Sequence, residues 1–305
     1  MRITNSLMSQ NFLSNLNNNM NNVYKYQEQL SSLKQVSRPS DDPLKVSKIM
    51  DLKNEIKQNQ QYKTTINDAI DFTNVQDSAL ANATNSLQRI HTLTQQAANG
   101  TYNTQDRQAI KTEIENEVET MMDSLNTNFG GRYVFAGKES TTKPFTTERA
   151  DDGNFSIKYE GSTMANNNVS KEIARGVNVE LKTDGLDLFN NNDGTENIGE
   201  LFNDIFTALD ADDVGKLGNL LGDIESQLEL TVNKRTEIGA IQNRLTAALD
   251  RNESEYLNLE TSLSTNQDID LAETYMNYTM EMNAYQASLS MGTKILQTNI
   301  MDYVR

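Results

Sequence analysis

The sequence has no cysteine, one histidine and only three prolines in 305 residues. Without cysteine the chain cannot form a disulfide framework, a thiolate metal site, a cysteine nucleophile or a thiol redox motif. His91 alone excludes the paired histidines of an HExxH zinc site, and it would have to serve any Ser/His/Asp site by itself. Its place after Ile90 in a polar stretch favours a solvated or packed histidine. We therefore expect no enzymatic activity and no cofactor or metal.

Positive charge is also scarce. The chain carries 27 Lys and Arg against 43 Asp and Glu, a formal net charge of −16, which argues against nucleic acid or an anionic membrane as a partner. The acid is concentrated in residues 184–229, which hold twelve Asp and Glu and one Lys. No segment approaches the roughly 18 to 20 apolar residues of a membrane span. We expect neither a cleaved signal peptide nor a membrane anchor.

Glycine and proline divide the chain into helical ends and a turn-rich middle. Glycine is absent from residues 1–99 and 240–291, and twelve of the fifteen glycines lie between Gly130 and Gly222. Long stretches without glycine or proline favour long helices, and glycine-rich stretches favour turns. Helical periodicity over residues 44–127 is interrupted by the turn signal Asn99-Gly100-Thr101, and a further helix is predicted from Ile198 to Ser264.

Apolar residues recur in both terminal segments at alternating spacings of three and four, the a/d pattern of a coiled coil. Two helices alone have little interior, so we expect the pattern to serve assembly with other subunits as well. Alone, such polar helices bury too little to offset the cost of ordering, so we expect residues 1–38 and 266–305 to fold only in the assembly. The predicted assembly seam comprises Leu13, Leu16, Met20, Val23 and Leu30 in the first segment and Leu271, Tyr275, Tyr278, Met282, Tyr285, Leu289 and Leu296 in the last.

The middle of the chain has the alternating pattern of β-strands. Phe155, Ile157 and Tyr159 alternate after a turn signal, and a second alternating run follows Gly176. The predicted fold is mainly α with a β-rich insert: a long antiparallel coiled-coil or helical stalk built from the two ends, with a small central β domain. The predicted domains are a terminal coiled coil (1–42 and 266–305), a helical stalk (43–139 and 196–265) and a projecting β-rich domain (140–195).

A proline-rich segment follows the first predicted helix. It consists of Arg38, Pro39, Ser40, Asp41, Asp42 and Pro43. Each proline disfavours helix at the residue before it, so the first helix must stop by about Ser37. Asp42 suits the N-cap of the next helix, with Pro43 as the first helical residue. The segment is either a joint with a mechanical role between domains or an ordinary helix cap.

One stretch has a partial match to a calcium-binding loop. Asn191, Asp193, Gly194 and Glu200 occupy positions 3, 5, 6 and 12 of an EF-hand pattern, but Phe189 stands at position 1, where the first carboxylate ligand belongs. A loop rich in Asn and Gly is the favoured interpretation, and binding of an ion stays open.

Three stretches resemble the flagellar hook-associated protein 3 family, the flagellin-like hook-filament junction proteins. They are Met1-Arg2-Ile3-Thr4, the segment Ser37 to Pro43, and the turn formed by Gly130, Gly131, Arg132, Tyr133, Val134, Phe135, Ala136 and Gly137. The resemblance covers about residues 1–145 and 225–305 and does not include the insert.

The resemblance implies a structural axial protein of the bacterial flagellum, exported by the flagellar type III apparatus. Its implied partners are copies of itself, hook-associated protein 1, flagellin and an export chaperone. Flagellin itself is an alternative, and a cytoplasmic coiled-coil adaptor is another. An enzyme on a flagellin-like scaffold would need a metalloprotease-type motif in the insert, and the sequence has none.

Overall fold

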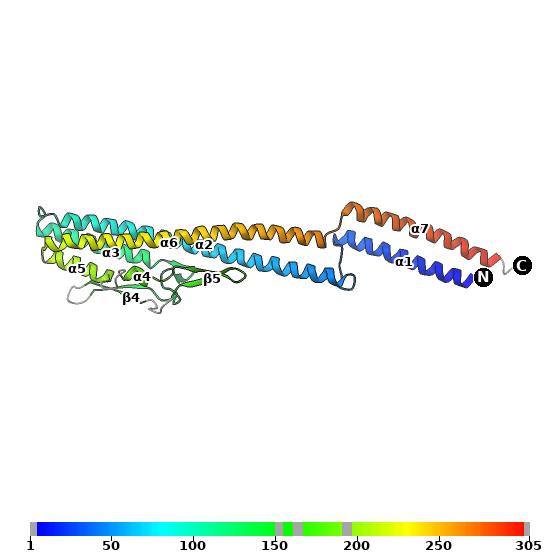
Figure 1. Ribbon diagram of the computed structural model, residues 1–305, viewed down its shortest axis with the longest axis horizontal. Coiled ribbons are helices and arrows are strands. Elements are labelled where there is room, and N and C mark those ends of the chain that lie inside the picture. Colours follow the sequence, from blue (N-terminus) through cyan, green and yellow to red (C-terminus); the bar gives the residue numbers. More distant parts are fainter. Residues whose placement is uncertain (1–4, 150–154, 161–166, 191–196, 302–305) are drawn as a thin grey trace. The chain divides into compact units, whose positions relative to one another are not determined.

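The computed structural model describes residues 5–149, 155–160, 167–190 and 197–301, and it divides into two compact units. Unit 1 comprises residues 1–58 and 255–305, and unit 2 comprises residues 59–254. The described helices are α1 (Asn5–Ser32), α2 (Pro43–Ala97), α3 (Thr104–Leu125), α4 (Leu186–Phe189), α5 (Ile198–Asp210), α6 (Val214–Gln267) and α7 (Leu271–Met301), labelled in part in Figure 1. The mainly α fold predicted from the sequence is confirmed. The unit boundaries fall inside α2 and α6, whereas the expected boundaries of the terminal domain, at 42/43 and 265/266, fall close to helix ends.

Unit 1 is built on the antiparallel pair of α1 and α7. Asn19 donates a side-chain hydrogen bond to Ser288 (3.1 Å), and Asn22 donates one to Glu281 (3.3 Å), so residue numbers rise along one helix as they fall along the other. The first turns of α2 and the last turns of α6 complete the unit. The pairing is shallow: among the side chains of α1 that the structure describes, Val23 is the one apolar residue with the burial of a core residue.

Unit 2 has the larger core. Its helices bury Leu80, Leu87 and Ile90 of α2 together with Ile114 of α3 and Ile205 of α5, all with no more than 1% of their surface exposed. The side chains recur at helical spacing along each helix, so each helix places one stripe in the core.

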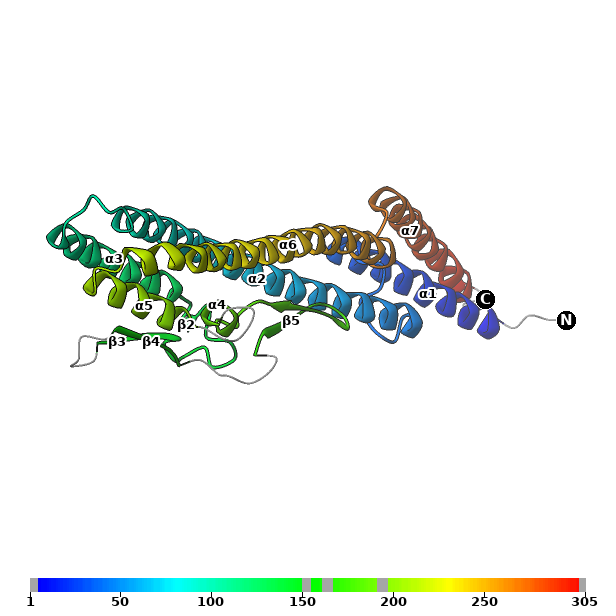
Figure 2. The same ribbon diagram turned by 60° about the vertical axis from the view of Figure 1, so that its left-hand side comes forward.

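In the described part of unit 2, three antiparallel two-stranded sheets lie against the helices: β1 (Asn128–Phe129) with β2 (Arg132–Tyr133), β3 (Phe145–Arg149) with β4 (Phe155–Tyr159), and β5 (Val169–Ala174) with β6 (Val177–Leu181). Both alternating runs predicted as strands are confirmed as β4 and β6. Figure 2 shows β3 and β4 beside α5, and β5 along the long helices.

The insert does not stand apart from the helices. Phe145, Ile157 and Leu188 belong to the same buried cluster as the helices, and Ile173 and Val179 pack with Ile66 and other α2 and α6 side chains. In the described residues the insert thus shares buried side chains with the helices. Alternation shows that one face of a strand is buried, but it does not show which partner covers that face.

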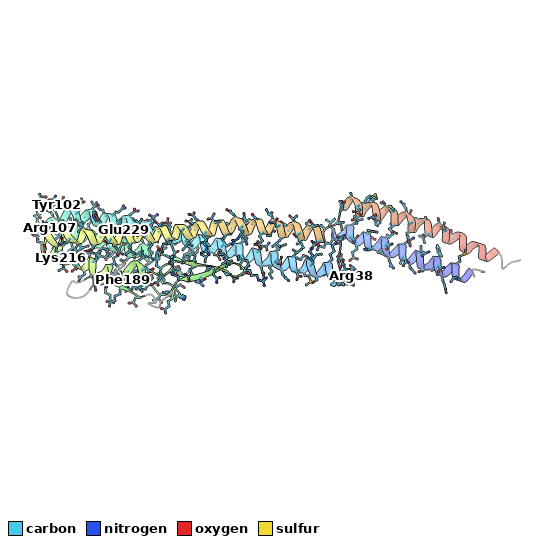
Figure 3. All side chains as sticks on the ribbon, in the orientation of Figure 1. Arg38, Tyr102, Arg107, Phe189, Lys216 and Glu229 are labelled. Atoms are coloured by element: carbon cyan, nitrogen blue, oxygen red, sulfur yellow. The ribbon has the colours of Figure 1, made fainter. Side chains whose placement is uncertain are left out.

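The single helix expected from Ile198 to Ser264 is two helices, and that expectation was wrong. The chain turns between α5 and α6 at residues 211–213, where Asp212 adopts a left-handed backbone conformation (φ 57°). Asp tolerates this region better than most residues do. Arg107 of α3 stabilises this turn through an ion pair with Asp212. The Arg107 side chain is almost fully buried and also donates a hydrogen bond to the Ala97 carbonyl (3.1 Å). Figure 3 shows Arg107 and Tyr102 at the same end of this unit.

Candidate functional site

The contact face between α1 and α7 follows a regular heptad. Its partly or fully buried positions are spaced four, three, four, three and four on each helix, as in a coiled coil. They are Phe12, Leu16, Asn19, Val23, Tyr26 and Leu30 on α1, and Thr274, Tyr278, Glu281, Tyr285, Ser288 and Gly292 on α7. The α1 side supplies mostly large side chains, and the α7 side supplies several small or polar ones.

Phe12 and Gly292 form the closest fit of this face. A Cβ atom added to Gly292 would lie 2.5 Å from Cζ and 2.8 Å from Cε1 of the Phe12 ring, so the glycine leaves the space that the ring occupies. Phe12 lies outside the predicted seam, which has Leu13 in its place. A glycine at a heptad position of an otherwise glycine-free helix was the signal that a large side chain packs opposite.

Part of the predicted seam lies in this contact face. Leu16, Val23, Leu30, Tyr278 and Tyr285 occupy heptad positions, and the structure brings them together. Met20 and Met282 are half-buried at its margin.

The rest of the predicted seam faces outward. Leu13, Leu271, Tyr275 and Leu289 are 53, 58, 61 and 43% exposed, and Leu296 lies in α7 with its side chain outside the described residues. The reason is geometric: the apolar stripe of each helix is wider than the strip that one partner helix can cover.

Exposed large apolar side chains are concentrated in unit 1. Of the eighteen in the described residues, four lie in unit 2: Tyr102, Phe129, Val177 and Val232. The other fourteen lie in unit 1, including Met276, Met280 and Met291 on α7 in addition to the outward seam residues. Such a concentration of exposed apolar side chains indicates a site of protein association. The outer faces of α1 and α7 are therefore the candidate assembly surface.

The proline-rich segment caps α2. Asp42 accepts a hydrogen bond from the backbone N–H of Lys45 (3.0 Å), and Pro43 is the first helical residue. Asp41 accepts from the N–H of Arg38 (3.1 Å), which closes a turn around Pro39. Helix α1 ends at Ser32, five residues before the limit set by the prolines.

The connection after α1 is paired with the connection before α7. Leu33 has a φ of 58°, and Lys34 forms an antiparallel bridge with Asp268. The backbone N–H of Gln35 donates to the carbonyl of Gln267 (2.7 Å). The connection after α1 and the connection before α7 are thus joined by backbone hydrogen bonds. The sequence carries no signal for this pairing.

The turn motif Gly130 to Gly137 ties the insert to the helices. Gly130 and Gly131 have positive φ (60° and 82°) and form the two-residue turn of the β1–β2 hairpin. Val134, Phe135 and Ala136 are buried directly after it. Gly137, also with positive φ (66°), has its Cα against the Asn167 side chain, which leaves no space for a Cβ.

Backbone carbonyls of this motif receive hydrogen bonds from both sides. Gln76 of α2 donates to the Val134 carbonyl (3.0 Å), and the Tyr159 hydroxyl donates to the Phe135 carbonyl (3.2 Å). Burial, and next the carboxylate of Asp184, raise the pKa of Tyr159 above its ordinary value near 10. The Tyr159 phenol therefore stays protonated and keeps donating over the whole neutral range.

Neither the partial calcium-binding loop nor His91 forms a recognisable site within the described residues. Residues 191–196, and with them Asn191, Asp193 and Gly194, lie outside the described residues, and Glu200 forms a capping box with Asn197 at the start of α5. Among the residues that the structure describes, no group of three His, Asp or Glu side chains could hold a metal ion. His91 Nε2 lies 3.3 Å from Glu225 Oε1 on the surface of the helices. Within the same ranges no helix is long and apolar enough to cross a membrane.

Comparison with known proteins supplies the family. The model of the bacterial flagellin N-terminal helical region matches residues 3–140, and that of the C-terminal helical region matches residues 214–304, together about three quarters of the chain. The chain belongs to the flagellin family. As a member of it, the chain is a structural component of the bacterial flagellum.

Relatives of this flagellin-family chain include both hook-associated and filament proteins. Flagellar hook-associated protein 3 of Escherichia coli K12 is 26% identical over 310 residues (94% of this chain, 95% of the relative). The flagellar filament 33 kDa core protein of Treponema phagedenis is 26% identical over 292 residues (95% and 94%). The crystal structure of the flagellar junction protein FlgL from Legionella pneumophila shares the fold, with a TM-score of 0.57 at 15% identity, over 73% of this chain and 100% of that one.

Proposed function

We propose that the chain joins the flagellar hook to the filament. Its partners in this role are further copies of itself, hook-associated protein 1 on the hook side and flagellin on the filament side. The role is that named by the hook-associated relatives, which match this chain over nearly its full length. The observation that carries an assembly role is the exposed apolar surface of α1 and α7, since ten of the fourteen large apolar side chains exposed in unit 1 lie on these two helices.

Export belongs to the same proposal. The chain leaves the cell through the flagellar type III apparatus, and an export chaperone covers the C-terminal helix until then. A chaperone is needed because Met276, Met280 and Leu289 would otherwise present apolar surface to the cytoplasm.

Electron microscopy of a deletion strain tests the junction role. The expected result is hooks without filaments, with flagellin released into the medium and attachment restored by the plasmid-borne gene. Attached filaments of normal length in the deletion strain would refute the proposal. A blot of sheared flagella tests the remaining alternative, because a cytoplasmic adaptor would be missing from that fraction.

Filament subunit is the second candidate function, favoured by the match to the Treponema filament core protein. The two candidates differ in copy number and position. A filament subunit would be a major band in sheared flagella, whereas a junction protein would be a minor one.

We also propose that Arg38 to Pro43 acts as the joint that ends the terminal pair and starts α2 at a defined residue. The Asp42 cap and the Arg38–Asp41 turn support it. Replacing Pro39 and Pro43 together with Ala should give a folded, secreted subunit that assembles poorly. Wild-type swimming and filament attachment in the double variant would refute the joint and show that the segment is an ordinary helix cap.

A further inference from the structure

Four charged side chains of α2 in unit 1 have no ion pair or hydrogen bond within the described residues. In unit 2, cations pair with nearby acids, for example Lys63 with Glu253 (2.7 Å) and Lys234 with Asp187 (2.8 Å). In unit 1, Asp51, Lys53, Glu55 and Lys57 are all exposed, and no ion pair or hydrogen bond of their side chains is found within the described part of the chain. The charges of this segment are therefore available to a partner.

The four charges form two edges on opposite sides of the helix. Residues four apart lie about 40° apart around a helix, and residues two apart lie about 200° apart. Asp51 and Glu55 therefore form one edge, here called the acidic edge, and Lys53 and Lys57 form the other, the basic edge. The buried Ile49 lies on the face between them. Lys48, three residues before Asp51, makes no ion pair with it in the described structure, and the acidic edge keeps a net negative charge.

This order of charges is unfavourable in the isolated chain. Like charges four residues apart repel each other on a helix, and opposite charges at that spacing attract. Exchanging the side chains at positions 53 and 55 would turn both repulsions into attractions with the same composition. The existing order instead gives each edge a net charge of one sign, which suits recognition by a surface of the opposite sign.

We infer that the basic edge of one copy packs against the acidic edge of a second copy. The inference rests on the proposed assembly role, and it adds the surface through which neighbouring copies recognise each other. Because the two edges lie on opposite sides of the same helix, every copy that uses its basic edge leaves its acidic edge free. Such head-to-tail contacts repeat until a ring closes or a helical array forms. Complementary charge of this kind sets which surfaces meet and how fast they do so.

Charge-swap variants of the full chain test the contact in a strain that lacks the wild-type gene. One variant carries Lys53→Glu with Lys57→Glu, a second carries Asp51→Lys with Glu55→Lys, and a third carries all four changes. The third variant has the same net charge as the wild type and two complementary edges again. Lys143→Glu with Arg175→Glu, at exposed sites of unit 2, controls for the change of net charge.

The measurement is the amount of each variant in sheared flagella relative to the amount secreted into the medium. Each two-residue variant should fall about tenfold in this ratio, equivalent to 1.4 kcal/mol. The four-residue variant should recover most of the ratio, and so should co-expression of the two failing variants. Wild-type ratios in both two-residue variants would overturn the inference. A four-residue variant whose ratio is as low as that of the two-residue variants, with an unchanged circular dichroism spectrum, would also overturn it.

The result separates this inference from the proposed function. If the wild-type chain is absent from sheared flagella, the proposed function itself fails. If the wild type is present there and charge reversal has no effect, the assembly role stands and only the contact between the edges is refuted.

Discussion

Gly292→Ala tests the fit between α1 and α7 with a single methyl group. The new Cβ would lie 2.5 Å from Cζ of Phe12, closer than carbon atoms approach without displacement, so the ring must move or the helices must separate. Overpacking of this kind costs about 1 to 3 kcal/mol. Alanine also favours helix over glycine by about 0.8 to 1.0 kcal/mol, but that gain belongs to α7. Helix α1 bears the steric cost without the gain.

Hydrogen exchange followed by mass spectrometry measures this difference on the full chain in its assembled form, in which the terminal segments are expected to be folded. In the Gly292→Ala variant we expect α1 amides to lose about 1 to 2 kcal/mol of protection, within the range expected for overpacking. Phe12→Leu in the same chain should restore much of the α1 protection, because the shorter side chain does not reach as far toward the new methyl group.

Gly239→Ala is the matched control, because a Cβ at this α6 position meets nothing within 4 Å. It should increase protection locally by about 0.8 to 1.0 kcal/mol and leave α1 unchanged. Unchanged or increased α1 protection in Gly292→Ala would refute the reasoning, since it would mean that Phe12 does not pack on Gly292.

Substitutions at four further positions test other parts of the account. Arg107→Lys should lower the free energy of unfolding by about 2 to 3 kcal/mol, measured in urea, because Lys cannot keep both the Ala97 carbonyl and Asp212 as partners. Asp42→Ala should lower the free energy of unfolding by about 1 kcal/mol, and Asp42→Asn should lower it much less, since Asn also caps helices. The pKa of Tyr159 is higher in the folded than in the unfolded chain, so its contribution to the free energy of unfolding is complete below about pH 10 and is lost as pH rises through the folded pKa. Above pH 10 the urea midpoint should therefore fall more steeply in the wild type than in Tyr159→Phe. Leu289→Asp should leave unfolding unchanged, because Leu289 is 43% exposed, but should stop assembly while secretion continues; normal motility would argue against the assembly surface.

Features with a local cause were predictable from the sequence. The α2 cap follows from Asp42 and Pro43, whose preferences depend on neighbouring backbone alone. The α2–α3 turn follows from Asn99 and Gly100, and the strands β4 and β6 follow from their alternation. Both terminal helices were likewise recognisable, because their apolar spacing repeats over several turns.

Features that depend on distant segments were not predictable. The heptad identified a broad apolar stripe, but the pairing of Phe12 with Gly292 selects which half of the stripe is covered, and this is a property of two helices together. The bridge between Lys34 and Asp268 joins backbone groups, which carry no side-chain signal. The packing of Ile173 against the long helices likewise depends on where the strand lies in space, and not on its own sequence.

Immunogold electron microscopy of intact flagella tests the junction role most directly. An antibody or epitope tag on the chain should label each flagellum at one place, between hook and filament, in a strain whose only copy is the tagged one and whose motility is normal. Label distributed along the whole filament would contradict the account and identify the chain as a filament subunit.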